Sequence, residues 1–177
     1  MNDGWVLGVS DDAFDGLMAS VDPPLIVLTT DADNEQAGCL VGFHAQSSIT
    51  PLHYCVWLSK ANHTYVVGLR AAHFAAHFLT ADDLPLAERF GTLSGEDTDK
   101  FAELDVDLDP YGVPDIKACQ NRISLERIAV LDDGSDHVCV TTRVRAARSG
   151  KRFVPLRVSQ ADHLVPGHSS ERRAIQP

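Results

Sequence analysis

The sequence has no long apolar run, few cysteines and a shortage of positive charge. With 15 Lys and Arg against 25 Asp and Glu, its formal net charge is -10, which argues against a nucleic-acid or anionic-membrane partner. No apolar stretch approaches the roughly 18 residues that a membrane-spanning helix needs. The first residues are acidic and lack the basic and apolar regions of a secretory signal. These absences predict a cytoplasmic location.

Metal and dinucleotide signatures are also missing. The four cysteines include no CxxC pair, so their spacing favours reduced thiols over zinc ligands. His73 and His77 stand four residues apart, but no third ligand follows, and residues 73–79 are better interpreted as a packed strand. A metal-dependent hydrolase is therefore the least favoured alternative. No GxGxxG follows a strand, which excludes the usual dinucleotide fingerprint.

What is present is a chain of short apolar strands. Its 177 residues and 44% hydrophobic content predict one domain with its own core. Strands are expected at residues 25–30, 38–43, 54–58, 73–79, 123–131, 138–146 and 151–158, and helices at 11–18, 63–72 and from about 80 to 90. This order predicts a mainly β fold with inserted helices, a closed or nearly closed barrel. We expect an N-terminal arm over residues 1–22, the barrel domain over 23–165 and a flexible tail over 166–177.

The acidic stretch at residues 81–110 interrupts the strands. It is interpreted as a solvated excursion of helix and loop, with Leu86 and Phe90 facing the core. Lys100 and Phe101 are expected in a short helical turn capped by Thr98, with a structural role. Whether this stretch covers a binding site as a lid is left open.

Two polar segments follow strands and together suggest a cradle for a phosphorylated ligand. The first is residues 44–48, and the second, residues 59–64, opens a helix that Asn62 can cap. Lys60 is a local cation beside hydroxyl groups at that helix start, a combination that suits a phosphate. Trp57, between the two segments, is expected in the core.

The order of these motifs resembles the flavin reductase-like family. The motifs are GCLVGFHAQSSITP, LSKANHTY, HFAAHFLTADDLPLAERFG, DKFA and DDGSDHVCV, and the resemblance covers about residues 23–164. It implies a split β-barrel that binds FMN or FAD and forms a homodimer. The residues implied to hold the cofactor are Gly42, Phe43, His44, Ala45, Gln46, Ser47 and Ser48 around the ring, and Ser59, Lys60, Asn62, His63 and Thr64 near the phosphate. His137, in the Asp136-His137 pair, is the implied catalytic residue near the nicotinamide.

The resemblance implies an NAD(P)H-dependent reductase of FMN or FAD, with a partner monooxygenase as one recipient of reduced flavin. Hydride chemistry belongs to the cofactor, so the protein needs only to position it and set its electrostatics. Val41, Gly42, His44 and Ala45 replace polar residues that are common in the family, so FMN, FAD and a deazaflavin all remain open, as do NADH and NADPH. The alternative function is a flavin- or deazaflavin-binding protein without reductase turnover.

Overall fold

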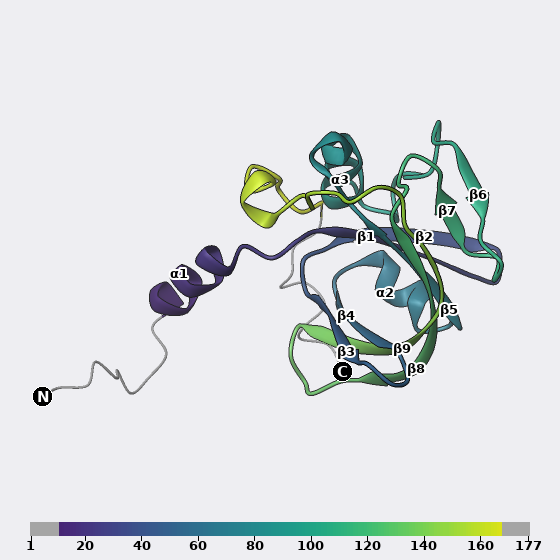
Figure 1. Cartoon of the computed structure of the whole chain (residues 1–177), viewed down its shortest axis with the longest axis horizontal. Helices are drawn as coiled ribbons and strands as arrows, with labels where there is room; N and C mark the ends of the chain where they lie inside the picture. Colours follow the sequence, from purple (N-terminus) through teal and green to yellow (C-terminus); the bar gives the residue numbers. More distant parts are fainter. Residues whose placement is uncertain (1–10, 168–177) are drawn as a thin grey trace, which may run out of the picture.

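A computed structural model describes residues 11–167. A single seven-stranded antiparallel sheet dominates it, in the order β2-β1-β5-β8-β9-β4-β3. The strands are β1 (Ile26–Ala32), β2 (Glu35–Val41), β3 (His44–Ser48), β4 (His53–Ser59), β5 (His73–Phe78), β8 (Arg122–Leu131) and β9 (His137–Arg148). Figure 1 shows the sheet curled around an interior that α2 (His63–Gly68) closes at one end. The mainly β split barrel expected from the sequence is therefore confirmed.

The barrel closes because one stretch of chain serves both edges of the sheet. β2 pairs with β1, and only two residues later β3 pairs with β4. The Trp57 N–H donates to the Phe43 carbonyl oxygen at 2.9 Å, so the bend at Gly42 and Phe43 is tied to β4. Residues 44–48, expected as a polar segment after a strand, are instead a strand of their own. The closure leaves a corner at Gly42 and Phe43, where the chain stops pairing with β1 and starts pairing with β4.

Apolar side chains of the strands fill the barrel. The inward residues include Ile26, Leu28, Val56, Phe74 and Leu125, all of them buried. A second core lies outside the barrel, where Val27 packs with residues of α3 (Leu84–Thr92) and of the chain after β9. β1 therefore faces apolar neighbours on both sides, as its uninterrupted apolar run predicts.

The acidic excursion is less solvated than the sequence suggested. Leu86 and Phe90 face the core as predicted, but Lys100 is only 4% exposed. Its ammonium donates to the carbonyl oxygens of Gly38 and Phe90, both at 3.1 Å, and desolvation lowers its pKa. Lys100 thus joins β2 to the last turn of α3, where helix carbonyls favour a cation. The turn at Lys100 is capped by Asp99, whose carboxylate accepts from the Phe101 N–H, and not by Thr98.

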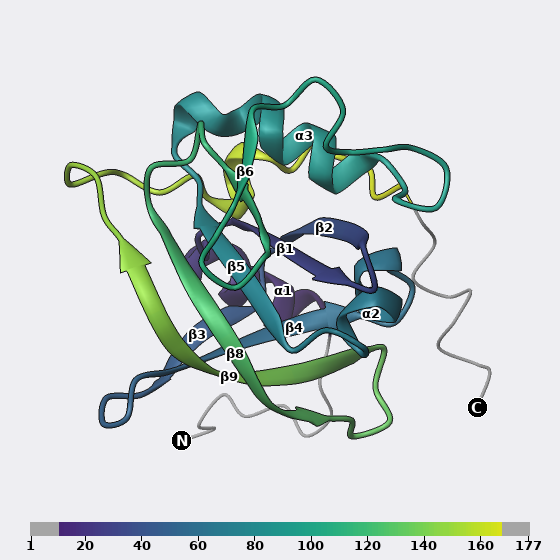
Figure 2. The ribbon, with the colours of Figure 1, turned by 90° about the vertical axis from the view of Figure 1, so that its right-hand side faces the viewer.

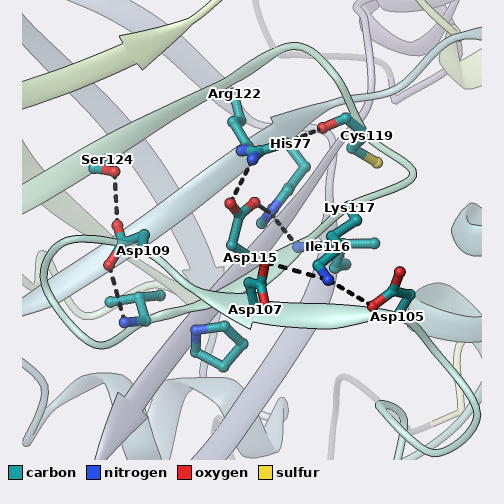
Figure 3. Close-up of polar contacts among 12 residues, drawn as sticks. His77, Asp105, Asp107, Asp109, Asp115, Ile116, Lys117, Cys119, Arg122 and Ser124 are labelled. Atoms are coloured by element: carbon teal, nitrogen blue, oxygen red, sulfur yellow. Dashed lines mark hydrogen bonds and ion pairs between the residues drawn. The ribbon is translucent and has the colours of Figure 1, made fainter.

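A small hairpin that the sequence did not reveal fixes the rest of the excursion. β6 (Val106–Leu108) pairs with β7 (Pro114–Ile116), and Figure 3 shows its anchors. His77, fully buried on β5, faces the Val27 carbonyl oxygen through Nδ1 at 3.2 Å and accepts the Ile116 N–H at Nε2 at 3.1 Å. Asp115 pairs with Arg122 at 2.5 Å. Both ring nitrogens of His77 are thus engaged by the backbone, which confirms the packed-strand interpretation.

Three smaller expectations were wrong. Residues 151–158 form no strand; they contribute only isolated bridges from Pro155 to Thr80 and from Arg157 to Pro24, followed by the 3-10 helix η2 (Val158–Gln160). The helix expected over 63–72 ends at Gly68. α3 follows the 3-10 helix η1 (Ala81–Asp83) and includes Gly91. Near Arg127, β8 shifts register against β9, which marks a β-bulge.

All four cysteines are free, and three of them are buried. Burial raises the pKa of Cys39 to about 11 and that of Cys119 to about 12. Among residues 11–167, no group of three or more His, Cys, Asp or Glu could hold a metal ion, and no helix is long and apolar enough to span a membrane. Of the expected domain limits, residues 1–10 and 168–177 lie outside the described residues, and the other limits stay predictions.

The contact between β2 and α3 gives a stability prediction. A Cβ at Gly38 would lie 2.7 Å from Phe90 Cε1 and 3.2 Å from the Leu28 carbonyl oxygen. Gly38→Ala should therefore lower the free energy of unfolding by about 1–3 kcal/mol, measured by urea denaturation. The matched control is Gly16→Ala in the helix α1 (Asp11–Val21), where a Cβ meets nothing within 4 Å; an equal effect of both changes would contradict the packing argument.

Candidate functional site

A pocket of about 270 Å³ lies at the corner where the ladder changes partner. Its walls come from the β2–β3 bend, the end of β4, the start of β9, α3 and the segment around η2. The lining residues that the argument uses are Gly42, Phe43, Trp57, Ser59, Asn62, Phe90 and His137. Residues far apart in the sequence therefore meet in one place because barrel closure brings β2, β4 and β9 together.

One wall of the pocket is aromatic. The rings of Phe43 and His137 lie with their centroids 5.3 Å apart, tilted by 58°. Trp57 is 36% exposed and lines the pocket, so its expected place in the core was wrong. In β4 the side chains alternate, with Val56 and Leu58 buried inside the barrel and Trp57 on the opposite face. That alternation was the available signal for Trp57 as a pocket residue.

The polar end of the pocket is built at the turn between β4 and α2. Asn62 has extended backbone angles, and its side-chain oxygen accepts from the Thr64 N–H at 3.0 Å, which confirms the expected cap. The Ser59 hydroxyl accepts from the Ala61 N–H at 3.3 Å. Ser59 and Asn62 line the pocket, whereas Thr64 is buried beneath them.

His137 enters the pocket with a fixed orientation. Its Nδ1 lies 2.9 Å from the Asp136 carboxylate, and that hydrogen bond is the main reason why the pKa of Asp136 is lowered. An ionised Asp136 can only accept, so Nδ1 carries the hydrogen. The Nε2 atom is then left to exchange a proton with a group in the pocket.

Lys60 lies beside the pocket but is already paired. Its ammonium is 2.8 Å from Asp132, and its backbone N–H donates to the Asp136 carbonyl oxygen. The turn between β8 and β9, which contains Asp132, therefore holds this lysine by an ion pair. A phosphate at Ser59 would have to compete with Asp132 for the same cation.

The other implied site residues lie away from this pocket. His44 turns to the Tyr54 hydroxyl at 2.6 Å and the Pro24 carbonyl oxygen at 2.9 Å, and burial lowers its pKa. His63 is 3.0 Å from Glu35 and lines a separate, more acidic hollow with Lys100. Four further residues are on β3 and are exposed or half-buried: Ala45, Gln46, Ser47 and Ser48.

The fit of the pocket to a flavin follows from its shape and donor set. An aromatic wall of Phe43, Trp57 and His137 suits a planar ring, and Ser59 and Asn62 supply hydrogen-bonding groups at one end. The volume lies just below the range of pockets that enclose a whole small ligand, so the ring fits inside and a ribityl phosphate fits only at the open rim. The residues present therefore fit the ring portion of such a cofactor.

The curled sheet and the pocket at its corner are those of a split barrel. Comparison with known proteins shows the family to which the chain belongs. The family model for the flavin reductase like domain matches residues 18–158, so the chain belongs to the flavin reductase-like family of oxidoreductases. It is 28% identical over 140 residues to the FMN reductase (NADH) SmoA of Agrobacterium fabrum, covering 79% of this chain and 78% of that protein.

Solved structures show the same fold. A protein of Sinorhizobium meliloti 1021 described as an oxidoreductase superposes with a TM-score of 0.73 at 22% identity, over 85% of this chain. This chain spans only 52% of that longer one. Nitrilotriacetate monooxygenase component B from Mycobacterium thermoresistibile gives a TM-score of 0.69 at 21% identity, over 80% of each chain.

The aromatic wall gives a binding prediction. Trp57→Ala should weaken FMN binding about two- to tenfold, because an aromatic stack contributes about 0.5–1.5 kcal/mol. Tyr111→Ala is the matched control, since Tyr111 has the same exposed fraction of 36% but stacks on His73 outside the pocket. Quenching of FMN fluorescence measures both, and equal affinities for the two variants would remove Trp57 from the site.

Proposed function

We propose that this protein catalyses the NADH-dependent reduction of FMN, with the ring of FMN in the pocket between the β2–β3 bend and β9. The observation that carries the proposal is the meeting of Phe43, Ser59 and His137, three residues implied by the resemblance, in one pocket. The similar FMN reductase (NADH) from Agrobacterium fabrum supports this choice of flavin and nicotinamide.

Each residue then has a physical role. The flavin, when bound, accepts a hydride from the nicotinamide. Phe43 and Trp57 position the ring and keep water from one face, Ser59 and Asn62 orient the polar end, and the His137 imidazole holds or moves a proton at Nε2. No strong nucleophile is needed, and the buried, protonated thiol of Cys39 does not supply one.

The nicotinamide binds loosely in this proposal. The pocket is open to solvent and has room for one ring system, and the sequence has no dinucleotide fingerprint. Reduced flavin would then leave through the same opening, and a partner monooxygenase is its proposed recipient. Similarity in fold to a protein named as a monooxygenase component supports that partner.

The proposal is tested by turnover. Purified protein should oxidise NADH at a rate that depends on added FMN, followed at 340 nm, with FAD and NADPH assayed in parallel. His137→Gln should reduce kcat by a larger factor than it raises the FMN dissociation constant, because it removes the proton-carrying Nε2 as well as one ring of the aromatic wall. Tight FMN binding without NADH oxidation would select the non-turnover alternative, and no change in FMN fluorescence on titration would reject both.

The position of the phosphate is tested through Asp132. If Lys60 serves the phosphate, Asp132→Asn frees the ammonium and should tighten FMN binding by up to about fivefold, the range of an exposed ion pair. Riboflavin, which lacks the phosphate, should bind both proteins equally. If Asp132→Asn tightens the binding of both FMN and riboflavin, or of neither, Lys60 does not bind the phosphate and only pairs with Asp132.

A further inference from the structure

Two of the four cysteines are neighbours on the outer face of the barrel. β4 and β9 run side by side (Figure 2), and their register places Trp57 opposite Cys139 and Cys55 opposite Thr141. Side chains two residues apart on a strand share a face of the sheet, so Cys55 and Cys139 are diagonal neighbours. Both point outward, because the residues that alternate with them along the two strands fill the interior of the barrel.

The two thiols interact with each other. Burial, and after it the neighbouring Cys55 thiol, raises the pKa of Cys139 to about 11. Cys55 is only 7% exposed, whereas Cys139 is half-buried and gives access from solvent. Cys119 is also buried, but charged side chains rather than a second thiol act on it. Cys55 and Cys139 therefore form a dithiol that a reagent can reach from one side.

The spacing of this pair suits a bridging ion better than a disulfide. A disulfide needs Cβ atoms about 3.5–4.5 Å apart, whereas diagonal neighbours in an antiparallel sheet stand about 7–8 Å apart, and somewhat less at Cβ. A direct bond between the sulfur atoms would therefore require the two strands to shift. Two metal–sulfur bonds of about 2.3 Å each span sulfur atoms about 4.6 Å apart, so a bridging ion needs no such shift.

The ligand set selects a soft ion of low coordination number. Thiolates favour Cu(I), zinc and iron–sulfur clusters, but zinc sites and these clusters need three or four protein ligands. In the part of the chain that the structure describes, no group of three or more His, Cys, Asp or Glu could hold a metal ion. Two thiolates are sufficient for Cu(I). We propose that Cys55 and Cys139 form a two-coordinate Cu(I) site.

The surroundings of the pair suit this ion. Trp57 and Leu131 lie opposite Cys139 on the two neighbouring strands, so apolar side chains limit the contact of the metal with water. On binding, each thiol gives up its proton, two copper–sulfur bonds form, and copper stays in the Cu(I) state. The proposal does not depend on the flavin chemistry, because neither cysteine lines the pocket assigned to FMN.

Titration with Cu(I) tests the site. The reduced protein is titrated without oxygen, in competition with the chromophoric chelator bicinchoninate. The wild-type chain should bind one Cu(I), and Cys55→Ala and Cys139→Ala should each lower the affinity a hundredfold or more. Cys119→Ala is the matched control, because it removes a buried thiol without a thiol neighbour, and it should keep the wild-type affinity. Wild-type affinity in Cys139→Ala, or an equal loss in the control, would overturn the proposal.

Two further measurements keep both cysteines in place, so they decide the question even where a cysteine variant does not fold. The X-ray absorption spectrum of bound copper should show two sulfur neighbours, and three or more would show a different site. The chain has two tryptophans, so in a Trp5→Phe variant all tryptophan fluorescence comes from Trp57. Cu(I) should quench that fluorescence, and an unchanged signal at one equivalent would place the copper elsewhere.

Oxidation tests the spacing argument. Folded protein is treated with diamide, digested without reduction and analysed by mass spectrometry. Cys55 and Cys139 should be recovered without a disulfide between them. A disulfide that joins the two would show that their sulfur atoms meet directly, and the pair would then be a redox pair rather than a copper site.

Discussion

The bend at Gly42 and Phe43 is the constraint on which the rest of the molecule depends. It lets β2 pair with β1 at one edge of the sheet and β3 pair with β4 at the other edge, so that one continuous stretch of chain joins the two edges. The hydrogen bond from the Trp57 N–H to the Phe43 carbonyl oxygen fixes that turn. At this corner the residues cannot pair with β1 and with β4 at the same time. The space left between the two strand pairs is the pocket. The site is thus a consequence of closure.

The excursion between β5 and β8 supports this corner from outside. Phe90 and Gly91 of α3 form one wall of the pocket, and α3 is held to β2 by the ammonium of Lys100. A buried ammonium without a carboxylate partner is costly, and here the carbonyl oxygens of Gly38 in β2 and Phe90 in α3 offset that cost. His77 does the same for the β6–β7 hairpin through neutral hydrogen bonds to the backbone. Lys100 and His77 are both buried and both bonded to backbone groups. They therefore position α3 and the β6–β7 hairpin on the outside of the barrel.

The sequence was informative where local pattern and tertiary structure agree. The strands expected at residues 25–30, 38–43, 54–58, 123–131 and 138–146 and the Asn62 cap follow from apolar runs and a capping residue, and the order of motifs gave the family. β3, at residues 44–48, did not follow because its sequence is polar. Predictions from the sequence were wrong where contacts between distant segments determine the position of a side chain. Lys100 looks solvated among acidic residues, and only the approach of α3 to β2 buries it. Trp57 looks like a core residue until β4 is placed at the barrel corner. His44 lies in the implied binding segment, but Tyr54 and the Pro24 carbonyl oxygen draw its ring away.

Charge is distributed unevenly over this small barrel. The walls of the pocket are largely aromatic and aliphatic, and two cations near it are already engaged, Lys60 by Asp132 and Lys100 by the carbonyl oxygens of Gly38 and Phe90. Exposed cations gather elsewhere, at the end of β9 and just after it: Arg143, Arg145, Arg148, Lys151 and Arg152. The pocket is nearly neutral because it lies at the corner of the sheet, where aromatic and aliphatic side chains of β2, β4 and α3 meet.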